Sequence, residues 1–305
     1  MLTFLASRAL YTLVVVWGVS IAVFLLIRLG GDPTALFLPP EANAEEIARM
    51  REALGFDRPY LVQYVDFLLR ALRGDFGFSL RQQQPAMDLV LDRLPATLEL
   101  GAVALVLSLV IGIPLGLVSA IHRGSSIDRV AMLISLFGQS FPAFWLAIMM
   151  ILLFSETLAV LPPSGRGGLE HLVMPGTVLA AFSTAIITRL LRSSMIEVLQ
   201  TDYIRTARSK GLRPRTVIFR HALRNAAIPT LTVVGLQVGA LLGGAVITEE
   251  VFAYPGVGRL AVQAIAQRDF AVVQAFVIFS AVLIVSINLL IDAVYVWLDP
   301  RLRRR

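Results

Sequence analysis

The chain alternates long apolar runs with short polar segments, and this pattern predicts a helical membrane protein. A helix of about 20 apolar residues is long enough to cross a bilayer. Six runs predict transmembrane helices, at about residues 9–29, 97–121, 130–160, 173–191, 229–247 and 271–297. The first run is too long for the core of a signal peptide, and no small-x-small cleavage site follows it, so we expect it to be retained. The expected fold class is an all-α polytopic membrane protein.

The positive charges predict the side on which each loop lies, because short cytoplasmic loops are enriched in Lys and Arg. Arg123 and Arg129 flank the turn after the second run, and four arginines lie in the basic tail 299–305. Both termini are therefore expected in the cytoplasm. The net charge of +6 could indicate nucleic-acid binding. We exclude that partner, because the basic residues gather in inter-span loops and in the tail, as orientation signals do.

Residues 30–94 form the longest polar segment, which we expect outside the cytoplasm. Asn43, with Glu46 three residues later, is typical of a capping box at a helix start. A second amphipathic helix is expected to end at Gly74, with apolar residues at helical spacing before it. These two helices can either cover the ends of the spans or face a soluble partner, and both interpretations stay open.

Polar side chains interrupt two of the apolar runs. In lipid, Gln139 and Ser140 need hydrogen-bond partners, and Pro142 frees a backbone carbonyl. These residues either line a water-filled path or bond to a neighbouring helix. Asp292 also lies within a span, where an acid is a functional candidate. Because it lies close to the inner interface, a structural pairing with a loop arginine is the alternative.

The fifth run carries a repeated spacing of small residues. Gly235, Gly239 and Gly243 recur every fourth position, so they share one face of a helix. Such a face lets another helix backbone approach closely. Its partner could be in this chain or in a second subunit.

The most basic stretch lies between the fourth and fifth runs, at 201–228. Thr201 and Asp202 can cap a helix start, and Gly211 is placed where that helix would end. Pro214 then allows a second helix that leads into the fifth span. The simpler alternative is a basic loop that only orients the protein and touches anionic lipid.

Several kinds of chemistry are missing from this sequence. It has no cysteine and three histidines, none of them in a metal-ligand spacing, so we expect neither a metal site nor a cofactor. No G-x-x-x-x-G-K-[ST] phosphate-binding loop occurs, and Lys210, the only lysine, is followed by Gly211. We therefore expect no enzyme activity in this chain, and ATP hydrolysis, if it drives transport, on a separate subunit.

Three stretches resemble one family. D-Y-x-R-T-A-R-x-K-G at Asp202–Gly211, followed by H-A-L-R-N-A-x-x-P at His221–Pro229, resembles the cytoplasmic "EAA" loop of permease subunits of bacterial ABC importers. The form is that of the dipeptide/oligopeptide/nickel branch. Two further stretches resemble the same branch: E-x-V-F-x-x-P-G-x-G at Glu249–Gly258 and R-G-D-F-G-x-S at Arg73–Ser79. In place of the general Glu-Ala-Ala triplet the chain has Thr206-Ala207-Arg208 or its neighbour.

The resemblance covers nearly the whole chain and implies the type I ABC importer permease fold. It implies a first span with a periplasmic helical segment at 1–94, and a permease core at 95–298. It also implies that a short helix docks in a cleft of an ATPase. The residues that it assigns to this coupling helix are Asp202, Tyr203, Arg205, Thr206, Ala207, Arg208, Lys210 and Gly211.

The expected function is that of a permease subunit in an ATP-driven, binding-protein-dependent importer of the bacterial inner membrane. The partners implied are two cytoplasmic ABC ATPase subunits, an extracytoplasmic solute-binding protein, membrane lipid and a second permease, with a heterodimer favoured over a homodimer. Dipeptides or oligopeptides are the expected substrates, with nickel chelates or glutathione as alternatives.

Two other classes of membrane protein fit the sequence less well. A gradient-driven secondary transporter would usually show internal repeats and buried ionisable groups near the midplane, whereas the sequence has no convincing repeat. A membrane-embedded hydrolase would need a placed nucleophile and base, and the chain has no G-x-S-x-G.

Overall fold

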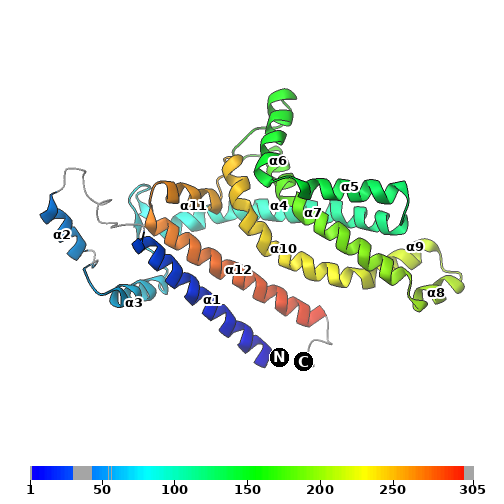
Figure 1. The fold of residues 1–305 in the computed structure, drawn as a ribbon, viewed down its shortest axis with the longest axis horizontal. Coiled ribbons are helices and arrows are strands. Elements are labelled where there is room, and N and C mark those ends of the chain that lie inside the picture. The colour runs from blue at the N-terminus through cyan, green and yellow to red at the C-terminus, as the bar shows by residue number, and fades with distance from the viewer. Residues whose placement is uncertain (1, 30–42, 54, 56, 299–305) are drawn as a thin grey trace. The chain divides into compact units, whose positions relative to one another are not determined.

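The computed structural model describes residues 2–29, 43–53, 55 and 57–298, and side chains within 10–26, 43–52, 55 and 57–291. These residues are mostly helical (Figure 1). The chain forms two compact units. The first contains the residues up to Pro95 together with Leu260–Leu289, and the second is chiefly Ala96–Arg259.

The described residues form helices, π-helical segments and a pair of short antiparallel strands. In order they are α1 (Leu2–Leu29), α2 (Ala44–Ala53), α3 (Tyr60–Ala71), β1 (Phe78–Ser79), β2 (Gln84–Pro85), α4 (Ala86–Ile121), α5 (Ser126–Ser140), α6 (Ala143–Met150), the π-helical segment η2 (Ile151–Thr157), α7 (Glu170–Leu199), α8 (Asp202–Ser209), α9 (Pro214–Thr216), the π-helical segment η3 (Val217–Ala222), α10 (Leu223–Val251), α11 (Val257–Ala266) and α12 (Phe270–Leu298).

Among the described residues, four helices are long and apolar enough to cross a membrane. They are Ala86–Ile121, Glu170–Leu199, Pro214–Val251 and Phe270–Ile291. A fifth crossing results if α5 and the helix Ala143–Thr157 count as one broken span, with a bend of 102° between them. Figure 1 shows α6 turning away from α5 at this break. The break falls where Pro142 was predicted to interrupt the third run.

In the first unit, α3 packs against α1 through aromatic rings. Phe24 of α1 lies 5.3 Å from Tyr64 and 6.0 Å from Phe67, measured between ring centroids. Ser20 and Tyr64 share a hydrogen bond of 2.8 Å between their hydroxyl oxygens. One face of the polar segment therefore covers a predicted span.

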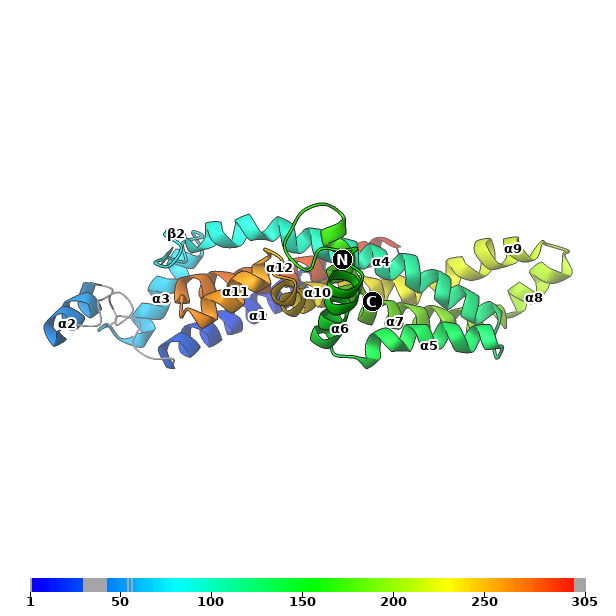
Figure 2. The same ribbon diagram turned by 90° about the horizontal axis from the view of Figure 1, so that it is seen from above.

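In the second unit, α7 is the central helix, with α5 and α10 packed along it. Both views show α5 running beside α7 (Figures 1 and 2). The helix α4 also approaches α7 closely, because a Cβ at Gly116 would lie 2.8 Å from the carbonyl oxygen of Thr188. At the other end of α7, a Cβ at Gly176 would lie 2.9 Å from Val103 of α4.

Local sequence signals and observed helix ends agree at some positions and differ at others. The predicted capping box forms, with Glu46 N–H donating to Asn43 Oδ1 at 2.9 Å and Asn43 N–H donating to Glu46 Oε2 at 3.0 Å. By contrast, α4 begins at Ala86, whereas the apolar run predicted a helix from about residue 97. Burial explains the earlier start, because Ala86, Leu89 and Val90 are at most 5% exposed.

Candidate functional site

The basic stretch folds into a short helix, a left-handed glycine and a second helix. Thr201 is extended and precedes α8, which ends at Ser209. Gly211 has φ +73°, a conformation that other residues rarely adopt, so it ends this turn as predicted. The second helix starts at Pro214 and runs through η3 into α10. Pro229 consequently lies inside a continuous helix, although the sequence suggested that the fifth span begins there.

One face of α8 is buried in the unit. Ile204 is fully buried and Ala207 is 8% exposed. They share an apolar cluster with the last turns of α4 and α7 and the first turns of η3 and α10. The other members of this cluster are Leu117, Ala120, Leu191, Met195, Val217, Ala222 and Ala226. Asn225 of α10 also donates from Nδ2 to Tyr203 Oη at 2.8 Å. Close-packed interiors transmit strain, so a displacement of α8 will act on all four helices.

The opposite face of α8 is exposed and basic. Most of the predicted coupling residues lie on this exposed side: Asp202, Tyr203, Arg205, Thr206, Arg208, Lys210 and Gly211. Arg213, Arg215, Arg220 and Arg224 are exposed in the following segment. Arg205 forms an ion pair with Asp202 at 3.3 Å, which contributes little because both side chains are largely in solvent. The surface therefore offers seven basic side chains against one acid to a partner.

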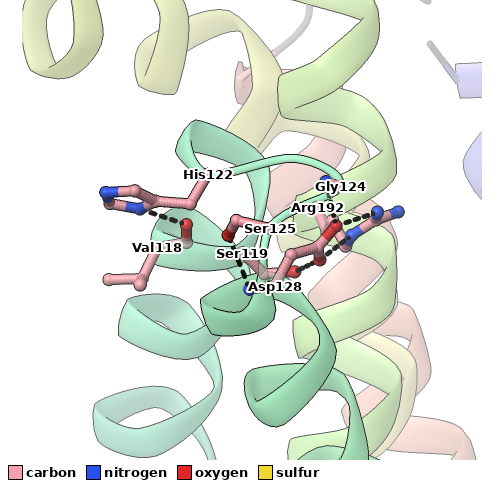
Figure 3. A network of polar contacts seen from close by, with 7 residues as sticks. All are labelled: Val118, Ser119, His122, Gly124, Ser125, Asp128 and Arg192. Atoms are coloured by element: carbon pink, nitrogen blue, oxygen red, sulfur yellow. Dashed lines mark hydrogen bonds and ion pairs between the residues drawn. The ribbon is translucent and has the colours of Figure 1, made fainter.

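An ion pair between the buried Asp128 and the partly buried Arg192 joins the start of α5 to α7 (Figure 3). Arg192 donates from Nε to Asp128 Oδ1 at 2.8 Å and from Nη2 to Asp128 Oδ2 at 2.7 Å. Asp128 also accepts hydrogen bonds from Ser119 Oγ and, at 2.9 Å, from Gly124 N–H. Ser125 caps α5 by accepting from the Asp128 N–H at 3.3 Å. The carboxylate thus holds together the end of α4, the turn and α7.

The predicted path residues lie at the break between α5 and α6. Ser140 donates to the carbonyl of Leu136 at 2.8 Å within its own helix, and Gln139 is partly buried. Pro142 precedes α6 as its N-cap residue. Phe141 stacks on Trp145 with ring centroids 4.5 Å apart. The polar patch is therefore at a sharp corner with an aromatic surface, and its role in a path stays a prediction.

Another pair of glycines, missed in the sequence reasoning, supplies the close helix contact. Gly112 and Gly116 in the stretch G-I-P-L-G have the same spacing and pack α4 against α7. At Gly243, by contrast, an added Cβ would meet nothing within 4 Å, and Gly235 and Gly239 are partly buried. The spacing of Gly112 and Gly116 was itself a visible signal.

A second missed feature is a pair of buried polar groups on α10. Gln237 donates from Nε2 to Ser183 Oγ of α7 at 3.0 Å. Near the end of α10, the fully buried Glu249 accepts from Thr97 Oγ1 at 2.6 Å and from Arg259 N–H at 3.0 Å. Gly258 lets the loop close over this carboxylate, because a Cβ there would lie 2.6 Å from Val246 Cα.

The same loop is also held by Glu99 of α4, which contacts both Tyr254 and Arg166. Tyr254 is buried and donates from its hydroxyl to Glu99 Oε2 at 3.2 Å. Arg166 pairs with Glu99 at 2.6 Å and, by that hydrogen bond, has a raised guanidinium pKa. Burial, with the nearby Glu99 charge, raises the pKa of the Tyr254 hydroxyl to about 12. The tyrosine therefore stays a neutral donor at neutral pH, and the loop is fixed at the end of α10 remote from α8.

The remaining predicted residue is Asp292, whose side chain lies outside the described residues. Within the part of the chain that the structure describes, no three His, Cys, Asp or Glu side chains gather where they could hold a metal ion.

Comparison with known families gives two adjoining matches. Residues 112–304 match the family described as "Binding-protein-dependent transport system inner membrane component", and residues 1–101 match the N-terminal part of such membrane components. Together these matches span nearly the whole chain.

Curated relatives match this chain over full length, and they include the following three. The chain is 40% identical to the dipeptide transport system permease protein DppB of Alkalihalophilus pseudofirmus, covering 99% of this chain and 100% of the relative. It is 38% identical to the di/tripeptide transport system permease protein DppB of Pseudomonas aeruginosa, covering 100% of both. It is also 38% identical to the glutathione transport system permease protein GsiC of Escherichia coli K12, covering 99% of both.

Solved structures show a similar fold at lower sequence identity. A chain of the inward-facing MetNI methionine ABC transporter aligns with a TM-score of 0.58 and 20% identity, covering 70% of this chain and 97% of that one. A chain from an amino acid ABC transporter aligns with a TM-score of 0.51, 19% identity, and coverage of 68% of this chain and 93% of that one.

Proposed function

The chain belongs to the family of binding-protein-dependent transport system inner-membrane components, and from this membership we propose the following mechanism. The protein is the permease subunit of an ATP-driven peptide importer in the bacterial inner membrane. The observation that carries the mechanism is the two-sided α8, with Ile204 and Ala207 buried and the basic face exposed.

Two separate ATPase subunits drive the transporter from the cytoplasm. Each permease presents α8 to a cleft of one ATPase, through the exposed side that carries Arg205 and Arg208. When ATP binding closes the ATPases, α8 moves, and its apolar cluster carries the displacement into α4, α7 and α10. The path then switches from inward-facing to outward-facing. A packed cluster suits this role because it moves as one body with the helix.

The complete membrane part is a pair of related permeases, in which a heterodimer is favoured over a homodimer. Each has six spans with both termini in the cytoplasm, and the segment 30–94 is periplasmic. The face formed by Gly235, Gly239 and Gly243 contacts the second permease. Support for this contact is the open space beside Gly243, since a small-residue face in a membrane helix favours close helix packing.

A soluble binding protein delivers the substrate to the periplasmic side. The substrates proposed are dipeptides or short oligopeptides, because two of the relatives carry dipeptide or di/tripeptide names. Glutathione fits the same proposal, since it is itself a small peptide and one relative carries its name. Nickel chelates remain the alternative within the branch.

Two substitutions at the coupling helix test the mechanism. Arg208→Glu reverses a charge on the exposed face of α8, and a glycine inserted after Gly211 loosens its connection to α10. We expect both variants to reach the membrane and to lose ATP-dependent peptide uptake in proteoliposomes, while Arg208→Lys retains most of it. A glycine inserted after Gly74, an exposed turn with open space beside it, is the control.

The result that contradicts the proposal is wild-type uptake by both variants. Uptake by the wild-type system that is abolished by a protonophore and indifferent to ATP would instead indicate a gradient-driven transporter. Failure of the wild-type permease to copurify with any ATPase would have the same meaning.

A further inference from the structure

The Asp128–Arg192 pair lies outside the exposed basic face of α8, yet it joins the helix that leads to α8 with the helix that leads to the polar corner. We propose that this ion pair fixes the α4–α5 turn to α7, so that the displacement of α8 reaches α5 and the polar corner at Gln139 and Pro142. Asp128 and Arg192 are then positioning residues for transport. The inference rests on the proposed function and adds to it a defined connection.

The connection starts from α7, which runs to Leu199 and meets α8 after two residues. Arg192 lies ten residues before Asp202 in the chain. Each residue of a helix adds about 1.5 Å along its axis. Leu191 and Met195, on either side of Arg192, belong to the cluster that buries Ile204. The guanidinium therefore sits on a part of α7 that is tied to α8 by apolar packing.

The geometry of the pair resists sliding. Two parallel N–H···O bonds between a guanidinium and a carboxylate fix direction as well as distance. Apolar side chains can slip past one another at small cost, but a shift of one residue along α7, about 1.5 Å, would break both bonds of 2.8 and 2.7 Å. Because the Asp128 side chain is only 6% exposed, water would compensate poorly for their loss.

The carboxylate is also held from its own side. Ser119 and the Gly124 N–H donate to Asp128, so the end of α4 and the turn move with it. In Figure 3 the Asp128 carboxylate lies between Ser119 and Arg192. Four donors thus converge on one carboxylate, which makes the α4–α5 turn and α7 a single body at this end.

A second fixed point lies further along α5. A Cβ at Gly138 would lie 3.0 Å from Ala181 of α7, so the two helices are in backbone contact next to the polar corner. Held at Asp128 and at Gly138, α5 can neither rotate nor slide independently of α7. A displacement of α7 is therefore delivered to Gln139, Ser140 and the break before α6.

Coupling in the assembled transporter tests the proposal. Asp128→Asn keeps the shape of the side chain but removes its charge, and Arg192→Lys keeps the charge but loses the two-pronged geometry. Both are reconstituted in proteoliposomes with the ATPases and the binding protein. The control is Arg129→Gln, an exposed arginine on the same turn that contacts Ser126 at 3.3 Å.

We expect the amount of assembled complex and its basal ATPase rate to stay close to wild type in all three variants. Peptide uptake per ATP hydrolysed should fall about tenfold in Asp128→Asn, within the usual range of coupling between sites, and less in Arg192→Lys. The Asp128→Asn/Arg192→Gln double variant should be no worse than Asp128→Asn, because residues that act as one unit are non-additive. Unchanged uptake per ATP in an assembled Asp128→Asn complex overturns the inference.

A distance measurement keeps the test valid if Asp128→Asn fails to assemble. The sequence has no cysteine, so spin labels can be placed at Leu133→Cys of α5 and Glu197→Cys of α7, both exposed, in a complex with cysteine-free partners. If α5 and α7 move as one body, the distance between the labels should be the same in the nucleotide-free and vanadate-trapped states. In Arg192→Lys this distance should change or its distribution should broaden. A wild-type distance that differs between states, or an unaltered Arg192→Lys distance, rejects the inference.

These outcomes are separable from failure of the proposed function. If wild-type uptake does not depend on ATP, the proposed function is lost whatever the variants do. If wild-type uptake depends on ATP and Asp128→Asn is fully coupled, only the positioning role of the ion pair is lost.

Discussion

The close contact between α4 and α7 predicts that a glycine-to-alanine substitution there destabilises the protein, although alanine is the better helix former. Alanine is normally favoured over glycine inside a helix by about 0.5–1 kcal/mol. At Gly116, however, an added Cβ would lie 2.8 Å from the Thr188 carbonyl oxygen and 3.1 Å from Leu191 Cβ. Gly116→Ala should therefore destabilise the protein.

The magnitude follows from the distances. Ordinary contact begins at 3.4 Å, so the two helices would have to separate by roughly half an ångström at this point. The hydrogen bond from Thr188 Oγ1 to the Gly112 carbonyl, already 3.3 Å long, lies one turn away and would lengthen. Overpacking costs about 1–3 kcal/mol, and a bond of this type in a membrane is worth about 0.6 kcal/mol. After the gain in propensity, we expect a net loss of about 1–2 kcal/mol.

The matched control lies in the same helix. At Gly101 the nearest atom to an added Cβ is Leu242 Cδ2 at 3.8 Å, which is ordinary contact, so Gly101→Ala should be neutral or stabilising by up to about 1 kcal/mol. The assay is the temperature at which half of the assembled transporter is lost from the size-exclusion peak after heating. Gly116→Ala should melt several degrees below Gly101→Ala. Equal melting of the two variants, or a higher value for Gly116→Ala, would refute the reasoning from close approach.

Two further predictions concern the loop after α10. Glu249→Gln replaces one of the two carboxylate oxygens by an amide N–H₂, so either the Thr97 hydroxyl or the Arg259 N–H loses its charged acceptor. The substitution should cost about 1–3 kcal/mol and speed proteolysis of residues 252–258; an unchanged cleavage rate and melting temperature would count against the buried contact. Because the pKa of Tyr254 is raised from 10.0 to about 12, the folded state retains its proton longer than the unfolded state. Stability should therefore fall as pH rises from 10 to 12. In Tyr254→Phe this part of the fall should be missing, which melting curves across the range can measure; identical profiles for both proteins would contradict the assignment.

Features set by neighbouring residues could be predicted from the chain alone. The capping box at Asn43 and Glu46, the left-handed Gly211 and the interruption at Pro142 all depend on a few adjacent positions. Each follows from backbone geometry and local hydrogen bonding. The apolar runs likewise predicted helices, because burial of backbone polar groups in lipid leaves few other structures.

Helix boundaries were less predictable where packing extends a helix. The apolar run suggested that the second span begins near residue 97, but α4 starts at Ala86. Leu89 and Val90, which lie before the apolar run, are buried. Hydropathy measures what lipid would solvate, and it does not register residues that other helices cover.

Which residues meet across the fold was decided by tertiary structure. Two glycine spacings looked alike in sequence, yet Gly112 and Gly116 pack against α7 while Gly243 has open space beside it. The pairing of Asp128 with Arg192 spans 64 positions and that of Thr97 with Glu249 spans 152. The sequence by itself determined the helical membrane class, the basic stretch with its short helix, and the family. It could not determine these partners, because a contact between distant segments depends on how whole helices pack, and local patterns of side chains carry no record of that geometry.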